Sequence, residues 1–265
     1  SFPSVLSKLI EQLTKPSMPS SMSIDNNRAG RFLIVDVYAK DLDGKDRVWP
    51  GGGIVDMGAY EFSADALTCG FVGDVREGPA PLTVVLTATA AGTNTAGLRY
   101  FWDVNNDGAW DQPDSAVVTN TYGPGLYGVA LAVSNAVGEV AGRTNTAYIL
   151  AAPSIVYVAT NGTHVAPFTN WATAATNVHA AFNLCGDGTT MLVSNGTFGV
   201  TSQLWLAKNI AILGANIATN AIVQRSGAAT HRVFVLTHTN AVLDRIRIAN
   251  GYAAFDYGGG IWMNT

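Results

Sequence analysis

The sequence predicts an all-β protein in which a two-layer β-sandwich is followed by a stack of β-coils. Charged residues make up 13% of the chain, which is roughly half the fraction found in an ordinary globular domain. The 28 glycines stand among many Thr, Asn and Ala residues, a mixture that suits short strands and tight turns. Strand-sized apolar runs separated by turn residues fill 63–152, and similar phrases recur about 30 residues apart after residue 153.

The bulk composition limits the possible classes of function. The chain has 265 residues, enough for about two domains. Its net charge of −4, without a run of like charges, argues against binding of nucleic acid. No apolar run approaches the ~20 residues that cross a bilayer, and no signal peptide is visible, so an extracellular location is inferred from the domains. Cys69 and Cys185 lie far apart, and we expect two small buried side chains rather than a disulfide.

Residues 1–62 are too few to bury a core of their own. Apolar positions 5, 6, 9, 10 and 13 share one helical face, which Pro16 ends, and Phe32–Val35 is a strand-sized run. Residues 41–47 and 55–62 resemble the closing signature of secreted right-handed β-helix proteins of the pectin-lyase-like class. This resemblance implies that 1–62 is the C-terminal remnant of a β-helix-type domain, partly irregular.

Residues 63–152 carry regular strand-sized runs at 81–87, 98–103, 116–119 and 127–133. In the last run positions 127, 129, 131 and 133 are large and the positions between them are small, which marks a strand with one face on a core. Short strands at this spacing predict a β-sandwich with Trp102 at the centre of its core.

The same segment resembles the PKD (polycystic kidney disease) domain. The resemblance rests on residues 78–84, on Tyr100-Phe101-Trp102-Asp103, and on residues 121–127 running on to 133–135. It implies an Ig-like sandwich that serves as a spacer or binding module in extracellular proteins, without catalysis.

Residues 153–265 begin with a strand at 155–158. Asn170 is a candidate N-cap for a helix at 171–185, whose apolar stripe ends just before Gly186. Short β-runs follow, and residues 209–214 are echoed at 240–244, which predicts stacked coils.

This segment resembles the opening of a right-handed parallel β-helix. The matching parts are 156–158, the helix from Trp171, 190–198, and 246–251 leading to 258–261. The resemblance implies that the helix caps the first coil, where uncovered backbone groups would otherwise be exposed. Members of the class continue for many more coils, so it also predicts that coils are missing from this chain.

Residues 103–114 form the sharpest candidate site. Aligned with a twelve-position calcium loop, they place Asp or Asn at positions 1, 3, 5 and 9, Gly at 6 and Asp at 12. Ca²⁺ takes about six to eight oxygen ligands, which this spacing supplies. The usual loop ends in Glu and lies between helices, whereas this one ends in Asp and lies between strands. A calcium loop and a plain Asp/Asn-rich turn therefore both remain open. The possible ligands are Asp103, Asn105, Asp107, Asp111 and Asp114.

The β-helix segment also offers charged and aromatic side chains. Related β-helix lyases abstract a proton next to a uronate carboxylate, which requires a cation and a base. Arg245 and Arg247 alternate with Ile246 and Ile248, so the outward face of an ordinary coil explains them, and we assign no catalytic residue. The four histidines show no metal-ligand spacing. The residues considered are Arg225, Asp244, Arg245, Arg247 and Asp256, with Trp205, Tyr252, Tyr257 and Trp262 for stacking on sugar rings.

Three functions remain open. The first is a non-catalytic segment of a secreted or cell-surface multi-domain protein, acting as scaffold, spacer or adhesion surface that contacts glycans. The second is part of a polysaccharide lyase, or another glycoside-degrading β-helix enzyme, whose catalytic coils are missing. The third is a carbohydrate-binding module centred on the sandwich. The expected partner is a polysaccharide or cell-surface glycan, and the expected cofactor is Ca²⁺ or none.

Overall fold

The computed structural model describes strands at 23–26 and 32–35, and residues 66–111, 114–216, 220–253 and 258–264. The chain divides into two compact units, residues 1–65 and 66–265. In the first unit β1 (Ser23–Asn26) pairs antiparallel with β2 (Phe32–Val35), so the expected strand at 32–35 is confirmed. The helix expected near residues 5–13 and the closing signature at 41–62 lie outside the described residues.

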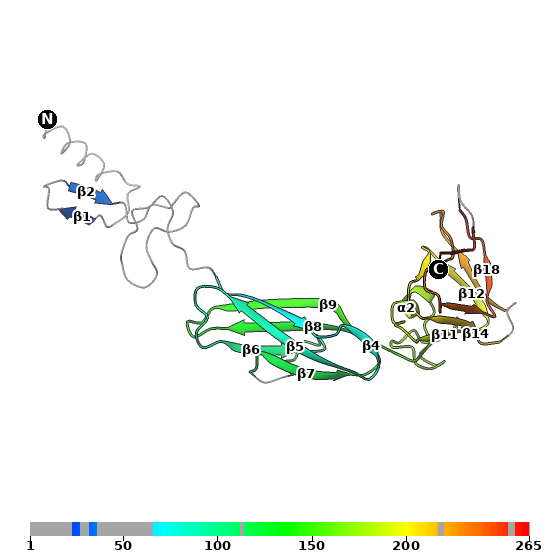
Figure 1. The fold of residues 1–265 in the computed structure, drawn as a ribbon, viewed down its shortest axis with the longest axis horizontal. Helices are drawn as coiled ribbons and strands as arrows, with labels where there is room; N and C mark the ends of the chain where they lie inside the picture. The colour runs from blue at the N-terminus through cyan, green and yellow to red at the C-terminus, as the bar shows by residue number, and fades with distance from the viewer. Residues whose placement is uncertain are drawn as a thin grey trace, which may run out of the picture. The chain divides into compact units, whose positions relative to one another are not determined.

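The second unit begins with two sheets that share one hydrophobic core (Figure 1). Their orders are β3-β5-β7 and β4-β9-β8-β6, and the strand pairs are antiparallel except for β4 with β9. The strands are β3 (Thr68–Gly73), β4 (Glu77–Pro79), β5 (Leu82–Ala91), β6 (Arg99–Asp103), β7 (Val117–Tyr122), β8 (Gly125–Ser134) and β9 (Val140–Ala152).

Trp102 lies at the centre of this core, as the sequence predicted. Its side chain is fully buried, and its Nε1 donates a hydrogen bond of 2.9 Å to the carbonyl oxygen of Ser115. The ring of Phe71 packs edge-on against it, with centroids 5.6 Å apart. On β8, Val129, Leu131 and Val133 are at most 1% exposed, so the period-2 pattern of this strand is confirmed.

Residues 155–263 form three sheets whose strands are all parallel: β10-β11-β14-β17, β12-β15-β18 and β13-β16-β19. From β11 onward the chain visits the three sheets in turn, so each of three rounds adds one strand to each sheet, and β10 adds a fourth strand to the first sheet. The strands are β10 (Ile155–Val158), β11 (Thr190–Val193), β12 (Gly196–Val200), β13 (Leu204–Leu206), β14 (Ala211–Gly214), β15 (Ala221–Arg225), β16 (Phe234–Leu236), β17 (Val242–Asp244), β18 (Arg247–Ala249) and β19 (Ile261–Met263).

The two phrases that echo each other in the sequence stack directly. Ile212 of β14 is opposite Leu243 of β17, and Leu213 is opposite Asp244. The row Val156, Met191 and Ile212 runs through the interior, and all three side chains are fully buried. The described part of the chain is therefore nearly all β, and its expected all-β class is confirmed.

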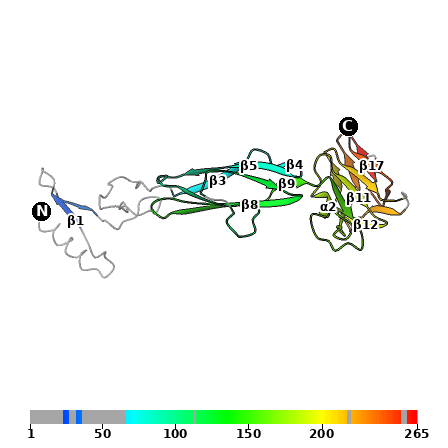
Figure 2. The ribbon, with the colours of Figure 1, turned by 90° about the horizontal axis from the view of Figure 1, so that it is seen from below.

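The expected helix at 171–185 is shorter than predicted. The structure has α2 (Val178–Phe182), with Asn177 and not Asn170 as N-cap; Asn177 Oδ1 accepts hydrogen bonds from the amides of His179 and Ala180. The preceding residues extend a sheet instead, since Ala175 bridges to Val158 in parallel. This pairing uses the backbone groups that a longer helix would need. The short helix contacts β10 and β12 beside the first coil (Figure 2).

The two-sheet module joins the coils with two intervening residues, Pro153 and Ser154. Ala152, at the end of β9, is 2% exposed, and its carbonyl oxygen accepts a hydrogen bond from the amide of Ala80. A Cβ atom on Gly186, in the first coil, would lie 2.6 Å from the Cβ of Ala152. The backbone of the first coil therefore packs directly on the end of β9.

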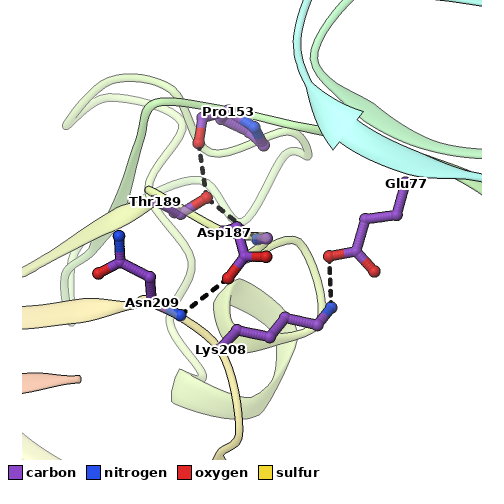
Figure 3. Close-up of polar contacts among 7 residues, drawn as sticks. Glu77, Pro153, Asp187, Thr189, Lys208 and Asn209 are labelled. Atoms are coloured by element: carbon purple, nitrogen blue, oxygen red, sulfur yellow. Dashed lines mark hydrogen bonds and ion pairs between the residues drawn. The ribbon is translucent and has the colours of Figure 1, made fainter. Parts of the chain in front are cut away.

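Polar contacts also cross this junction (Figure 3). The Thr189 hydroxyl donates to the carbonyl oxygen of Pro153, and the amide of Thr190 donates to the carbonyl oxygen of Ser154. The ammonium group of Lys208 forms an ion pair with Glu77 of β4. Hydrogen bonds and an ion pair thus connect the coils to the junction residues and to β4, so the junction is not a free linker.

Candidate functional site

The loop after β6 brings three of the five possible calcium ligands around one turn. Asp103 is 4% exposed, and its two carboxylate oxygens accept hydrogen bonds from the amides of Asp107 and Gly108, at 3.1 and 2.9 Å. The side-chain oxygen of Asn105 also accepts from the amide of Asp107, at 3.0 Å. Asn106 adopts a φ of 56°, which Asn tolerates better than most residues. Short Asp and Asn side chains therefore build this turn by bonding to its own backbone.

Asp107 completes the turn. One of its carboxylate oxygens accepts from the amide of Ala109 and the other from the side-chain amide of Asn105, both at 2.9 Å. These two hydrogen bonds lower the pKa of Asp107 below its usual value, and the bond from the Ala109 amide has the larger effect. The carboxylate is therefore held in its charged form.

Asp111 and Asp114 bond to the flanking strands instead. Asp111 Oδ2 accepts from the amide of Val104 at 2.9 Å, and the amide of Asp111 donates to the carbonyl oxygen of Trp102. Asp114 accepts from the amide of Tyr100 at 2.8 Å and from Arg99 Nε at 2.9 Å. The Tyr100 amide and then the Arg99 guanidinium lower the pKa of Asp114.

The five residues thus act as a hydrogen-bonding frame for the loop. Among the residues that the structure describes, no three His, Cys, Asp or Glu side chains form a group suited to a metal ion. The arginine that holds Asp114 competes with a cation for the position-12 carboxylate. Asp103, Asn105 and Asp107 nevertheless provide oxygen atoms close to one turn, so calcium binding stays a prediction.

Three of the charged residues considered for catalysis bond to the backbone or to one another, and Arg247 is exposed on β18. Arg225 donates to the carbonyl oxygens of Asn250, Gly227 and Ala229. Arg245 pairs with its neighbour Asp244 at 3.0 Å, and both side chains are about half exposed. Asp256 and Tyr257 lie outside the described residues.

Two histidines of the coils have buried ring nitrogens. The Nε2 atoms of His179, on α2, and His231 have no hydrogen-bond partner. Burial, and then the nearby His231, lower the pKa of His179, so its imidazole is kept neutral. His179 is half-buried on α2, which fits a packing role.

The described aromatic residues proposed for sugar contact are exposed or half-buried: Trp205, Tyr252 and Trp262. Trp205 is 52% exposed, and its Nε1 donates to the Thr237 hydroxyl at 3.3 Å. Trp205, Val235 and Trp262 form one row across the sheet β13-β16-β19. This row was not recognisable from the sequence, because the three strands lie about 30 residues apart and only their register aligns the side chains.

Comparison with known proteins gives no relative. No family model, curated protein or solved structure matches this chain. No helix among the described residues is both long enough and apolar enough to span a membrane.

Proposed function

We propose that residues 66–265 combine a PKD-like, Ig-like sandwich with the first coils of a right-handed parallel β-helix. In this proposal the segment is a non-catalytic scaffold or spacer of a secreted or cell-surface protein. The two-sheet module with Trp102 in its core supports the first assignment. The three parallel sheets, visited in turn and flanked by α2, support the second.

The observation that carries the spacer role is the junction at Pro153 and Ser154. Flexible linkers between domains are usually longer, polar and exposed. Here the junction is two residues long, and Ala152 and Pro153 are both buried. A connection of this kind transmits orientation from one module to the next, which is what a spacer needs.

A glycan-contact role for the coils rests on the outer row of Trp205 and Trp262. Exposed aromatic rings stack on the apolar faces of sugars, and a half-exposed Trp on a flat sheet is suited to this. Arg225, Asp244 and Arg245, considered for lyase chemistry, have structural partners, and this supports the spacer over the enzyme alternative.

The spacer role is tested by ¹⁵N NMR relaxation of the whole chain. Amides of the core strands β8 and β14 should report a single rotational diffusion tensor, because the two modules tumble as one body. Two separate tensors would reject the spacer. An ultraviolet assay for unsaturated products from pectate and alginate, with Ca²⁺ present, should show no activity, and product formation would establish the lyase alternative. Affinity electrophoresis in the same polymers should show retardation that Trp205→Ala reduces.

A further inference from the structure

An open hollow of about 770 Å³ lies along one side of the two-sheet module. It is formed by residues of β3 and β9, with Arg76 from the loop between β3 and β4 and Thr89 from β5. β3 is the outermost strand of its sheet, and β4 pairs only with residues 150–152 of β9. Within the described part of the chain, β3 and the part of β9 before residue 150 therefore each present a free edge to the hollow.

A bulge in β9 shapes this hollow. Tyr127 is opposite Ile149, but Val129 is opposite Asn145, so β9 has extra residues between the two pairs. Ala147 within the bulge has a φ of 51°. Bulges bend a strand and redirect its side chains. Tyr148 lies within this bulge, Arg143 and Asn145 come before it on the strand, and all three line the hollow.

The wall is basic although the whole chain carries a net charge of −4. Arg76 lies over the ring of Tyr148, with its guanidinium carbon 4.6 Å from the ring centroid, and Arg143 Nε donates to Asn145 Oδ1 at 3.1 Å. Among the described residues that line the hollow, none is Asp or Glu.

The acidic residues on either side of Arg76 in the sequence are bonded elsewhere. Asp74 Oδ1 accepts hydrogen bonds from the amides of Val75 and Val85, and Glu77 pairs with Lys208. The positive charges of the hollow are therefore not neutralised by these neighbours.

We propose that this hollow binds an oxyanion: a carboxylate, sulfate or phosphate group. The planar guanidinium offers several N–H donors in a fixed fork that matches such groups. The Tyr148 ring holds Arg76 in place, and the bond to Asn145 orients Arg143. This site goes beyond the proposed function, because a spacer requires no ligand on this face.

Cys69 provides a reporter inside the hollow. It is a free, half-buried thiol on the wall, whereas Cys185 is buried in the coils. Burial raises the pKa of Cys69 and the charge of Arg143 opposes this, while burial raises the pKa of Cys185 to about 12. A neutral reagent such as iodoacetamide should therefore alkylate Cys69 in the native chain and leave Cys185 unmodified.

The experiment measures the alkylation rate of Cys69 in the full chain at constant ionic strength. Sodium sulfate, sodium phosphate and sodium glucuronate are titrated separately, with sodium chloride and uncharged glucose as controls, and calorimetry repeats each titration. At least one oxyanion should slow alkylation saturably, and the controls should not. The oxyanion that protects at the lowest concentration identifies the source of the group.

Matched arginine variants decide whether the hollow is the site. Arg76→Gln and Arg143→Gln should each raise the half-saturating concentration roughly tenfold, as expected for losing one charged hydrogen-bonding group. Arg76→Lys keeps the charge but loses the forked guanidinium. Its half-saturating concentration should therefore lie between those of Arg76→Gln and the unsubstituted chain. Arg245→Gln removes the same charge from the coils and should change nothing. Absence of saturable protection and heat, or a half-saturation that neither hollow variant alters, would overturn the proposal.

Discussion

The hydroxyl of Thr189 donates a 2.8 Å hydrogen bond to the carbonyl oxygen of Pro153, 36 residues earlier in the chain. The hydroxyl oxygen of Thr189 in turn accepts a hydrogen bond of 3.0 Å from the amide of Gly186. Thr189 is 1% exposed, so both bonds lie out of contact with water (Figure 3). One side chain thus ties the first coil to the junction with the two-sheet module.

Thr189→Val should destabilise the second unit by about 1–3 kcal/mol, because it leaves a buried amide and a buried carbonyl without their partner. Urea unfolding, followed by far-ultraviolet circular dichroism, measures the change. Thr197→Val is the matched control, since Thr197 is exposed on β12 and should change stability by less than about 0.5 kcal/mol. Equal effects of the two substitutions would show that the Thr189 bonds do not contribute.

Gly186→Ala should also destabilise the junction, by roughly 1–3 kcal/mol. The added Cβ would lie 2.6 Å from the Cβ of Ala152 and 3.1 Å from Glu77 Oε1, so the first coil must move away from β9. Gly142→Ala serves as the control, because its nearest neighbour would be 3.9 Å away. Thermal melting of both variants tests this, and a Gly186→Ala chain as stable as the control would mean that the junction is looser than described.

Asp114 should make part of the stability pH-dependent. Its pKa lies below the usual 3.8, because the Tyr100 amide and Arg99 favour the charged form. Its contribution is therefore fully present above about pH 4 and is lost as the pH falls through the folded-state pKa. Asp114→Asn should melt at a lower temperature than the unsubstituted chain at pH 6, and the gap should close toward pH 2.5. In an Arg99→Gln background the difference in melting temperature at pH 6 should be smaller. A difference that stays constant with pH would contradict a lowered pKa for Asp114.

Calcium is tested through the same melting transition. If residues 103–114 hold Ca²⁺, millimolar calcium should raise the melting temperature and a chelator should reverse the rise, because a ligand that binds the native state stabilises it. Asp103→Asn should remove the response, whereas Asp244→Asn, on the coils, should keep it. A melting temperature that changes with neither calcium nor chelator would show that the loop is a hydrogen-bonded turn without a metal.

The sequence predicted the strands whose pattern is local. The alternation on β8, the central position of Trp102 and the stacking of β14 on β17 all follow from apolar spacing or from a repeated phrase. In each case the signal lies within one strand or one repeat, where burial directly dictates residue type.

The features that depend on distant pairing could not be predicted. The helix was placed at 171–185 because its apolar stripe fits a helix, but Ala175 pairs with Val158 and the helix begins only after Asn177. Cys69 was expected to be buried and is half-exposed, since it lies on the outermost strand β3 beside the hollow. For the loop, spacing identified the Asp and Asn residues but not their bonds to Arg99 and to the backbone.

We infer that residues 66–265 form one continuous body with no flexible joint at Pro153 and Ser154. Native-state hydrogen exchange measures this most directly, at the amides of Leu150 and Thr190, which donate to Arg76 and Ser154 on either side of the joint. Both amides should be protected to the same degree as the amides of the core strands β8 and β14. Exchange of either amide at the rate of an exposed loop, while β8 and β14 stay protected, would contradict it.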